Sequence, residues 1–240
     1  MPDGLLGREI VLAGGSGGLG SPSAELLAGD GARLVVSYHS EAARAARLAA
    51  IATTVQCDLT KAADRTSLLD AAPNLYGLVV FTGDPARVKN PDELEAQLRH
   101  SHEVNYAGPI LLARAAVDRM DASKTPGAIV FLSTMQAVAL FPGSTAYAGA
   151  KTALLHAAKI LAKECRGPSN IRVNVIAPGV MQAGMAEASI ASGKYNRFVE
   201  EGMIPRFGRA QDVARAVRFL MEPDNYVTGQ VISVDGGITL

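Results

Sequence analysis

The sequence of 240 residues has no tryptophan, two cysteines and no excess of charge of either sign. Cys57 and Cys165 are far apart and lack Cys-x-x-Cys spacing, so we expect no disulfide framework and no metal, as suits a reducing cytoplasm. The 23 basic and 23 acidic side chains balance, which argues against nucleic acid as a partner. No apolar stretch approaches the length of a membrane span, so the sequence predicts a cytoplasmic protein that binds no membrane.

Short apolar runs alternate along the chain with longer amphipathic segments. Hydrophobic residues make up 48% of the sequence and charged residues 19%, which is typical of a globular protein. The apolar runs predict strands at residues 9–13, 33–37, 53–57, 78–82, 128–133, 171–176 and 231–234. The longer segments predict helices at residues 18–28, 41–51, 61–70, 145–166 and 211–221, with one broken or two consecutive helices over 91–120.

This alternation of strands and helices predicts the fold. Strand–helix–strand units place parallel strands in one sheet, with right-handed crossovers and helices on both faces. Nearly continuous apolar runs fit a parallel sheet that is buried on both sides. Because no linker or internal repeat divides the chain, residues 1–240 should form a single doubly wound α/β domain of about seven strands.

Residues 180–208 form the least regular segment of the chain. They follow the sixth predicted strand at its carboxyl end, where ligands bind in open α/β sheets. We therefore interpret them as a mobile flap over a binding site. The alternative is an ordinary surface excursion.

A glycine-rich segment, AGGSGGLG at residues 13–20, joins the first predicted strand to the first predicted helix. Glycines let the backbone turn sharply and approach a pyrophosphate closely, and a helix N-terminus attracts the anion. The position at the first strand–helix junction favours a dinucleotide site over a merely flexible turn.

The residues after the second predicted strand bear on which dinucleotide binds. A carboxylate there would bind the adenosine ribose and repel a 2′-phosphate, but the segment SYHS at residues 37–40 precedes the first acid, Glu41. Hydroxyls and an imidazole can donate to a phosphate, so the sequence favours NADP over NAD. Arg44 and Arg47 lie further on and are interpreted as solvated helix residues.

Tyr147 and Lys151 lie four residues apart in a predicted helix, which puts both side chains on one face. A neighbouring cation favours the phenolate, so the pKa of the Tyr147 phenol should fall toward neutrality and make it a usable acid. The alternative is an exposed helix surface without chemistry.

Together with the spacing Gly14-x-x-x-Gly18-x-Gly20, the Tyr147-x-x-x-Lys151 pair resembles the short-chain dehydrogenase/reductase family. The resemblance covers essentially the whole chain and includes members of the β-ketoacyl carrier-protein reductase type. Further matching segments are CDL at residues 57–59, Asn105, RVNVIAPG at 172–179, IPRFGR at 204–209, VTGQV at 227–231 and VDGG at 234–237.

The resemblance implies a Rossmann-type fold and hydride transfer between NAD(P) and a small-molecule carbonyl or alcohol. It implies that Tyr147 is the general acid, that Lys151 stabilises the tyrosinate and binds the nicotinamide ribose, and that Asn105 supports a proton-carrying water. The residues expected to bind the cofactor are Gly14, Ser16, Gly17, Gly18, Leu19, Tyr38, His39, Ser40, Asp58, Leu59, Thr82, Gly83, Tyr147, Lys151, Pro178, Gly179 and Val180. Family members are usually homotetramers or homodimers.

Four positions depart from the family pattern. Ala13 replaces a threonine, VFTG at residues 80–83 replaces Asn-Asn-Ala-Gly, and Ala183 replaces a threonine near the nicotinamide. The position of the catalytic serine falls on Thr134, next to Ser133. If the strand continues through them, the two hydroxyls face opposite ways and cannot both reach the substrate, and we assign the role of oxyanion donor to Thr134.

Three functions are compatible with these residues. The first is an NADP-preferring ketoreductase, and the second is an NAD-dependent alcohol or sugar dehydrogenase. The third is a cofactor-binding protein with little or no turnover, which the altered segment at 80–83 and the threonine at 134 would explain. Small apolar residues in the flap indicate a partly hydrophobic substrate.

Overall fold

The computed structural model describes residues 4–167 and 169–240. Seven parallel strands form one sheet in the order β3-β2-β1-β4-β5-β6-β7, which confirms the predicted doubly wound α/β fold. The strands are β1 (Glu9–Ala13), β2 (Arg33–Tyr38), β3 (Ala52–Gln56), β4 (Leu75–Val80), β5 (Gly127–Leu132), β6 (Ile171–Pro178) and β7 (Val231–Val234).

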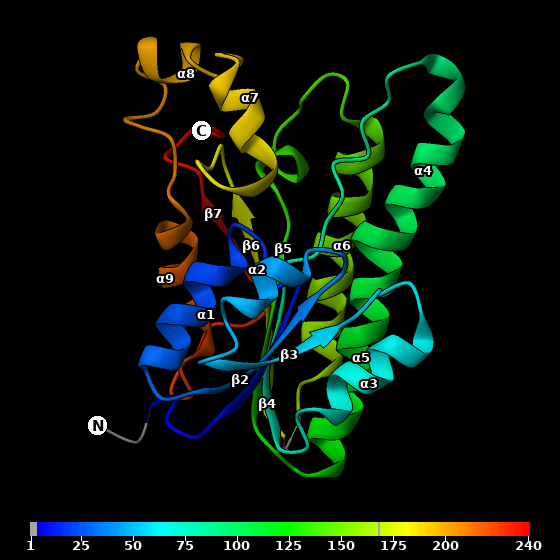
Figure 1. Cartoon of the computed structure of the whole chain (residues 1–240), viewed down its shortest axis with the longest axis vertical. Helices are drawn as coiled ribbons and strands as arrows, with labels where there is room; N and C mark the ends of the chain where they lie inside the picture. The colour runs from blue at the N-terminus through cyan, green and yellow to red at the C-terminus, as the bar shows by residue number, and fades with distance from the viewer. Residues whose placement is uncertain (1–3, 168) are drawn as a thin grey trace.

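Helices cover both faces of this sheet (Figure 1). The α-helices are α1 (Gly20–Gly29), α2 (Ala42–Ala46), α3 (Ala62–Asp70), α4 (Leu94–His102), α5 (Gly108–Ala122), α6 (Thr145–Glu164), α7 (Glu187–Ala191), α8 (Arg197–Glu200) and α9 (Ala210–Met221). Short 3-10 helices are η1 (Pro91–Glu93), η3 (Met135–Ala137) and η4 (Gly184–Ala186), and η2 (Glu103–Ala107) is a π-helix between α4 and α5. No helix in these ranges is both long and apolar enough to cross a bilayer.

Two apolar cores hold the helices against the sheet. One core unites β-strand side chains with Leu68 of α3, Leu112 of α5 and Leu154 of α6. The other lies on the opposite face, where Leu27 of α1 and Val217 of α9 pack together. Every residue of β4, β5 and β6 is buried, as expected for parallel strands that are covered on both faces.

The strand order places the binding site. After β1 the chain builds β2 and β3 on one side and then returns to add β4 on the other side of β1. The loops after β1 and β4 therefore diverge at the carboxyl edge, and a crevice opens between them. This switch point is where ligands bind in folds of this kind.

The predicted flap contains η4, α7 and α8, which lie beyond the carboxyl ends of the strands (Figure 1). Its two ends meet in a parallel bridge between Met181 and Gly208. A third apolar cluster, including Val180, Phe198 and Ile204, packs within it. The flap is thus a small folded lobe whose two ends, the stem of the flap, are joined by this bridge. Its mobility stays a prediction.

Most predicted bounds are off by one or two residues, and two predicted elements differ more from the structure. The helix predicted over 41–51 ends after α2 and continues as turns to Ile51, since Ala45 and Leu48 are the buried residues of this segment and two apolar contacts do not hold a longer helix. Strand β4 begins three residues before the predicted start. The prediction began too late because Gly77 interrupts the apolar run in the sequence. In the structure Gly77 nevertheless pairs with Ile10 of β1.

Candidate active site

A cleft of about 1420 Å³ lies at the carboxyl ends of the strands. The glycine loop and the start of α1 line one part, and the segment after β2 lines the adenosine end that the sequence predicts. The residues after β4 and β5, the start of α6 and the flap line the rest. Tyr147, Lys151 and Thr134 all face this cleft.

Lys151 is the most constrained of the predicted catalytic residues. It lies one turn beyond Tyr147 in α6 and is 2% exposed. Its Nζ donates to the backbone carbonyl of Thr82 at 3.0 Å and to that of Leu132 at 2.9 Å. These carbonyls lie just after β4 and at the end of β5, so the ammonium ties two adjacent strand ends together. The two bonds use two of its three N–H groups.

The pKa values of this pair contradict one expectation from the sequence. Burial raises the pKa of the Tyr147 phenol to about 12, the Thr134 side chain lowers it in part, and the Asp84 carboxylate raises it further. Burial lowers the pKa of Lys151 to about 7. The prediction that Lys151 brings the pKa of Tyr147 toward neutrality is therefore wrong for the protein alone, because loss of hydration is the largest influence on the phenol. Tyr147 is protonated at neutral pH, as an acid must be before it donates.

The hydroxyls of Ser133 and Thr134 point in different directions. Ser133 Oγ donates to the backbone carbonyl of Lys151 at 3.2 Å, so it faces α6. Thr134 has an extended backbone, with φ −160° and ψ 154°, and its hydroxyl accepts from the Gln136 amide at 3.3 Å. The Thr134 side chain also interacts with the Tyr147 phenol. The structure thus places Thr134, and not Ser133, beside the predicted acid.

Asn105 lies in the π-helix η2 and is fully buried. Its Oδ1 accepts from the Asp84 amide at 2.9 Å, and its Nδ2 donates to the Asp84 carbonyl at 2.9 Å and to Ser101 Oγ at 3.0 Å. The side chain therefore fixes the loop after β4 to the helix pair. Its support of a water stays a prediction.

The glycine loop leaves no room for side chains at several positions, of which Gly14 and Gly18 face the cleft. Gly14 has φ +72°, and a Cβ there would lie 2.9 Å from Thr82 Cγ2. A Cβ on Gly18 would lie 2.5 Å from the Gly184 amide nitrogen, so the stem of the flap approaches the loop backbone closely. The Gly14 amide donates to the Ser37 hydroxyl at 2.9 Å, which fixes the loop to β2.

These features fit the dinucleotide that the sequence predicts. The bare loop backbone leads into α1, whose N-terminal dipole favours a pyrophosphate. Within residues 4–167 and 169–240, Thr82 Oγ1 is the one buried side-chain polar atom without a hydrogen-bond partner. Thr82 lines the cleft and its side chain lies against Gly14, so an unpaired polar group at this place fits a site that binds a ligand.

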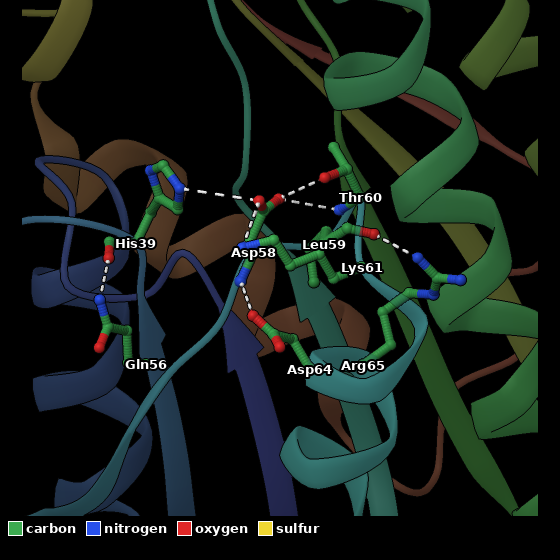
Figure 2. Close-up of polar contacts among 8 residues, drawn as sticks. All are labelled: His39, Gln56, Asp58, Leu59, Thr60, Lys61, Asp64 and Arg65. Atoms are coloured by element: carbon green, nitrogen blue, oxygen red, sulfur yellow. Dashed lines mark hydrogen bonds and ion pairs between the residues drawn. The ribbon is translucent and has the colours of Figure 1, made fainter.

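Asp58 connects two loops at the predicted adenosine end (Figure 2). Its Oδ1 accepts from the Thr60 amide at 3.0 Å and from the Thr60 hydroxyl at 2.7 Å. Its Oδ2 lies 4.0 Å from His39 Nε2 and 3.7 Å from Lys61 Nζ. The Thr60 hydroxyl, ahead of burial and the other contacts, holds the pKa of Asp58 below its usual value. Asp58 therefore shapes its own turn and faces the imidazole of the neighbouring loop.

The remaining predicted cofactor residues also line the cleft. Arg44 and Arg47 are exposed, as interpreted from the sequence, but they line the cleft near His39 as well. The other lining residues among those predicted are Ser16, Gly17, Leu19, Tyr38, Ser40, Leu59, Pro178, Gly179 and Val180. The structure therefore brings the whole predicted set together around one cleft.

Comparison with known proteins decides the family. A family model described as enoyl-(acyl carrier protein) reductase matches residues 13–239. The 3-oxoacyl-[acyl-carrier-protein] reductase of Rattus norvegicus is 34% identical over 242 residues, covering 97% of this chain and 98% of the rat protein. The chloroplastic NADPH-dependent aldehyde reductase-like protein of Arabidopsis thaliana is 32% identical over 257 residues, covering 97% of this chain and 94% of that protein. The chain belongs to the short-chain dehydrogenase/reductase family.

A solved structure supports the same assignment. A 7α-hydroxysteroid dehydrogenase complexed with NADH and 7-oxo glycochenodeoxycholic acid matches with a TM-score of 0.88 and 29% identity, covering 97% of this chain and 94% of that one. As a member of this family, the protein is an oxidoreductase of carbonyl or alcohol groups that uses a nicotinamide cofactor. The varied activities of its relatives leave the substrate to be argued from the site.

Sequence reasoning missed three polar residues of this short-chain dehydrogenase/reductase. Asp84 follows Gly83 in the loop after β4, and its carboxylate lies 3.7 Å from His100 Nε2. Both side chains line the cleft near Tyr147. Ser101 is buried behind Asn105. A helical spacing of four residues between Ser101 and Asn105 was the one available signal, whereas Asp84 and His100 become neighbours only through the fold.

Proposed function

We propose that this protein is an NADP-preferring ketoreductase of the 3-oxoacyl carrier-protein reductase type. One observation carries the proposal. A protonated Tyr147 lies beside the Thr134 side chain in a cleft, with the buried Lys151 one helical turn away. A general acid and a hydrogen-bond donor that converge on one point suit an oxygen that gains negative charge.

The reduced nicotinamide, when bound, supplies the hydride that adds to the carbonyl carbon. Thr134 donates a hydrogen bond to the carbonyl oxygen and stabilises the charge that develops on it. Tyr147 transfers its phenolic proton to that oxygen, which leaves an alcohol and a tyrosinate. Lys151 in its ammonium form stabilises the tyrosinate until solvent returns a proton.

The glycine loop around Gly14 and Gly18 would hold the pyrophosphate, and Lys151 the nicotinamide ribose. The preference for NADP rests on the adenosine end of the cleft. His39, Arg44 and Arg47 line it, and β2 ends without an acid. The two guanidinium groups attract a 2′-phosphate, and residues 37–40 at the end of β2 include no carboxylate that would repel it.

The acyl substrate is proposed from the other end of the cleft. Apolar side chains line it from three segments: Met135 after β5, Phe141 before α6, and Val180, Met185 and Phe198 from the flap. Such a surface favours an apolar chain next to the reacting carbonyl. The rat relative, a 3-oxoacyl-[acyl-carrier-protein] reductase, supports the same class of substrate.

The proposal is tested by following the absorbance of the reduced cofactor. Purified protein is mixed with NADPH or NADH and with a 3-oxoacyl thioester, a β-ketoester, apolar ketones and sugars. We expect oxidation of NADPH with the oxoacyl compounds. Faster turnover with NADH and sugars would support the NAD-dependent dehydrogenase. Cofactor binding without turnover of any substrate would support a binding protein.

Self-association and a cytoplasmic location complete the proposal. Apolar side chains are exposed on two helical faces: Leu94, Leu98 and Leu111 on α4 and α5, and Phe219 on α9. A homotetramer or homodimer would bury such surfaces. Light scattering after gel filtration measures the mass of the assembly, and a monomer would refute this part of the proposal. The two cysteines are free thiols, which suits a reducing cytoplasm.

A further inference from the structure

Ser101 makes two buried hydrogen bonds that join the predicted catalytic residues. It lies in α4, one helical turn before Asn105, and is 0% exposed. Its hydroxyl donates to the backbone carbonyl of Ala146 at 2.8 Å and accepts from Asn105 Nδ2 at 3.0 Å. A buried hydroxyl with both bonds satisfied is a strong local constraint, because losing either leaves a polar group without a partner.

The Ala146 carbonyl belongs to the residue directly before Tyr147. Both residues lie in the first turn of α6, which begins at Thr145. The other partner, Asn105, is bonded twice to the Asp84 backbone. Ser101 therefore links three segments that border the cleft: the loop after β4, the π-helix η2 and the first turn of α6.

The first turn of α6 lacks one usual constraint of a helix N-terminus. Ser144 occupies the N-cap position, but no side-chain cap bond is formed there. Its hydroxyl bonds to Gln136 instead. A helix without a side-chain cap tends to fray at its first turn, which in α6 carries Tyr147. The bond from Ser101 anchors this turn from the neighbouring helix.

We propose that Ser101 is a positioning residue that holds the Tyr147 phenol beside Thr134. The inference rests on the proposed ketoreductase function. It adds a residue that touches neither substrate nor cofactor but acts on Tyr147 through Ala146. Because proton transfer depends on the placement of the donor within fractions of an ångström, loss of this anchor slows the chemical step more than it weakens binding.

Two substitutions of one residue separate positioning from packing. Ser101→Ala removes the hydroxyl, and Ser101→Cys fills its place with a somewhat larger thiol that donates poorly. We expect kcat to fall about tenfold or more in both variants, with the Kd for NADPH unchanged and a larger isotope effect when the transferred hydrogen of NADPH is deuterium. If Ser101→Cys retains the rate of the wild type while Ser101→Ala loses it, Ser101 fills space and the proposal is overturned.

Tyr76→Phe provides a matched control. Tyr76 is 2% exposed, and its hydroxyl also donates to a helix carbonyl, that of Met221, at 2.8 Å. It lies near the amino end of β4, away from the cleft. We expect this variant to lower the melting temperature as Ser101→Ala does and to leave kcat unchanged. An equal loss of kcat in both variants would show a general effect of destabilisation.

Hydrogen exchange tests the anchor independently of turnover. The amides of Ala150 and Lys151 close the first α6 turns, so in Ser101→Ala they should exchange faster than in the wild type or in Tyr76→Phe. If the wild type reduces no substrate but this difference appears, the proposed function fails and the anchoring role stands. If exchange and kcat are both unchanged in Ser101→Ala, the inference is wrong.

Discussion

The Ser133 hydroxyl donates to the backbone carbonyl of Lys151 at 3.2 Å and so faces helix α6. Thr134, the next residue, is left as the hydroxyl beside Tyr147. Two adjacent hydroxyls of similar chemistry thus have different partners. Ser133 binds to the backbone of α6, and Thr134 lies beside Tyr147 in the cleft. This division allows each to be tested by its own variant.

Substitution of Thr134 should affect the chemical step. Thr134→Val keeps the shape and removes the hydroxyl, so we expect kcat to fall roughly 10²-fold, as when an oxyanion donor is lost. Thr134→Ser should retain most of the rate, because the donor remains. Steady-state kinetics with NADPH measures both. Ser133→Ala is the neighbouring comparison and should change kcat far less. An unchanged rate in Thr134→Val would remove Thr134 from the mechanism.

Substitution of Tyr147 should abolish turnover. Tyr147→Phe removes the acid and keeps the ring, so we expect kcat to fall at least about 10²-fold, with the Kd for NADPH nearly unchanged. Fluorescence titration of NADPH checks binding, and absorbance of the reduced cofactor checks turnover. Full activity in this variant would mean that another group supplies the proton.

An acid at the end of β2 should reverse the cofactor preference. Tyr38→Asp places a carboxylate beside the predicted 2′-phosphate site, so we expect the Kd for NADPH to rise about tenfold or more relative to that for NADH. Tyr38→Phe removes the hydroxyl without adding charge and serves as the control. If Tyr38→Asp leaves the ratio of the two Kd values unchanged, the adenosine end lies elsewhere.

Lys151 should make stability depend on pH. Burial lowers its pKa from 10.5 to about 7, so between these values the unfolded chain binds more protons than the folded protein. The free energy of unfolding therefore rises with pH in this window. At the upper end of this pH range the two cysteines oppose the effect of Lys151. Burial raises the pKa of Cys57 and Cys165 from 9.0 to about 11, so above about pH 9 their contribution makes the free energy of unfolding fall with pH.

Urea unfolding between about pH 7.5 and 8.5, without cofactor, measures this slope. The wild type should gain stability with rising pH relative to Lys151→Met, which lacks the titrating group. If the free energy of unfolding depends on pH in the same way in both proteins, the Lys151 ammonium keeps its charge at little cost in stability, and the lowered pKa is wrong.

Local patterns in the sequence predict much of the fold. The apolar runs predict both ends of β1 and β7 correctly, and the interrupted helical pattern over 91–120 covers α4, the π-helix and most of α5. These features depend on neighbours in the chain, which is why they can be read there. Ser133 and Thr134 have different hydrogen-bond partners, although β5 ends at Leu132 and the expected strand does not continue through them.

Features that depend on distant neighbours could not be predicted. The pKa of Tyr147 is set by burial beneath other segments, and spacing along the chain does not report burial. The bond from Ser101 to Ala146 crosses between helices and depends on their relative rotation. The pairing of Asp84 with His100 likewise needs the path of the loop after β4.

The two carbonyl bonds of Lys151 have a consequence for how an inactive variant is interpreted. Its ammonium joins the loop after β4 to the end of β5, so a substitution there moves backbone that borders the cleft as well as removing a charge. Loss of activity in a Lys151 variant therefore does not by itself assign the lysine a chemical role. The Tyr147 hydroxyl faces the cleft, so Tyr147→Phe is the cleaner test of the chemistry.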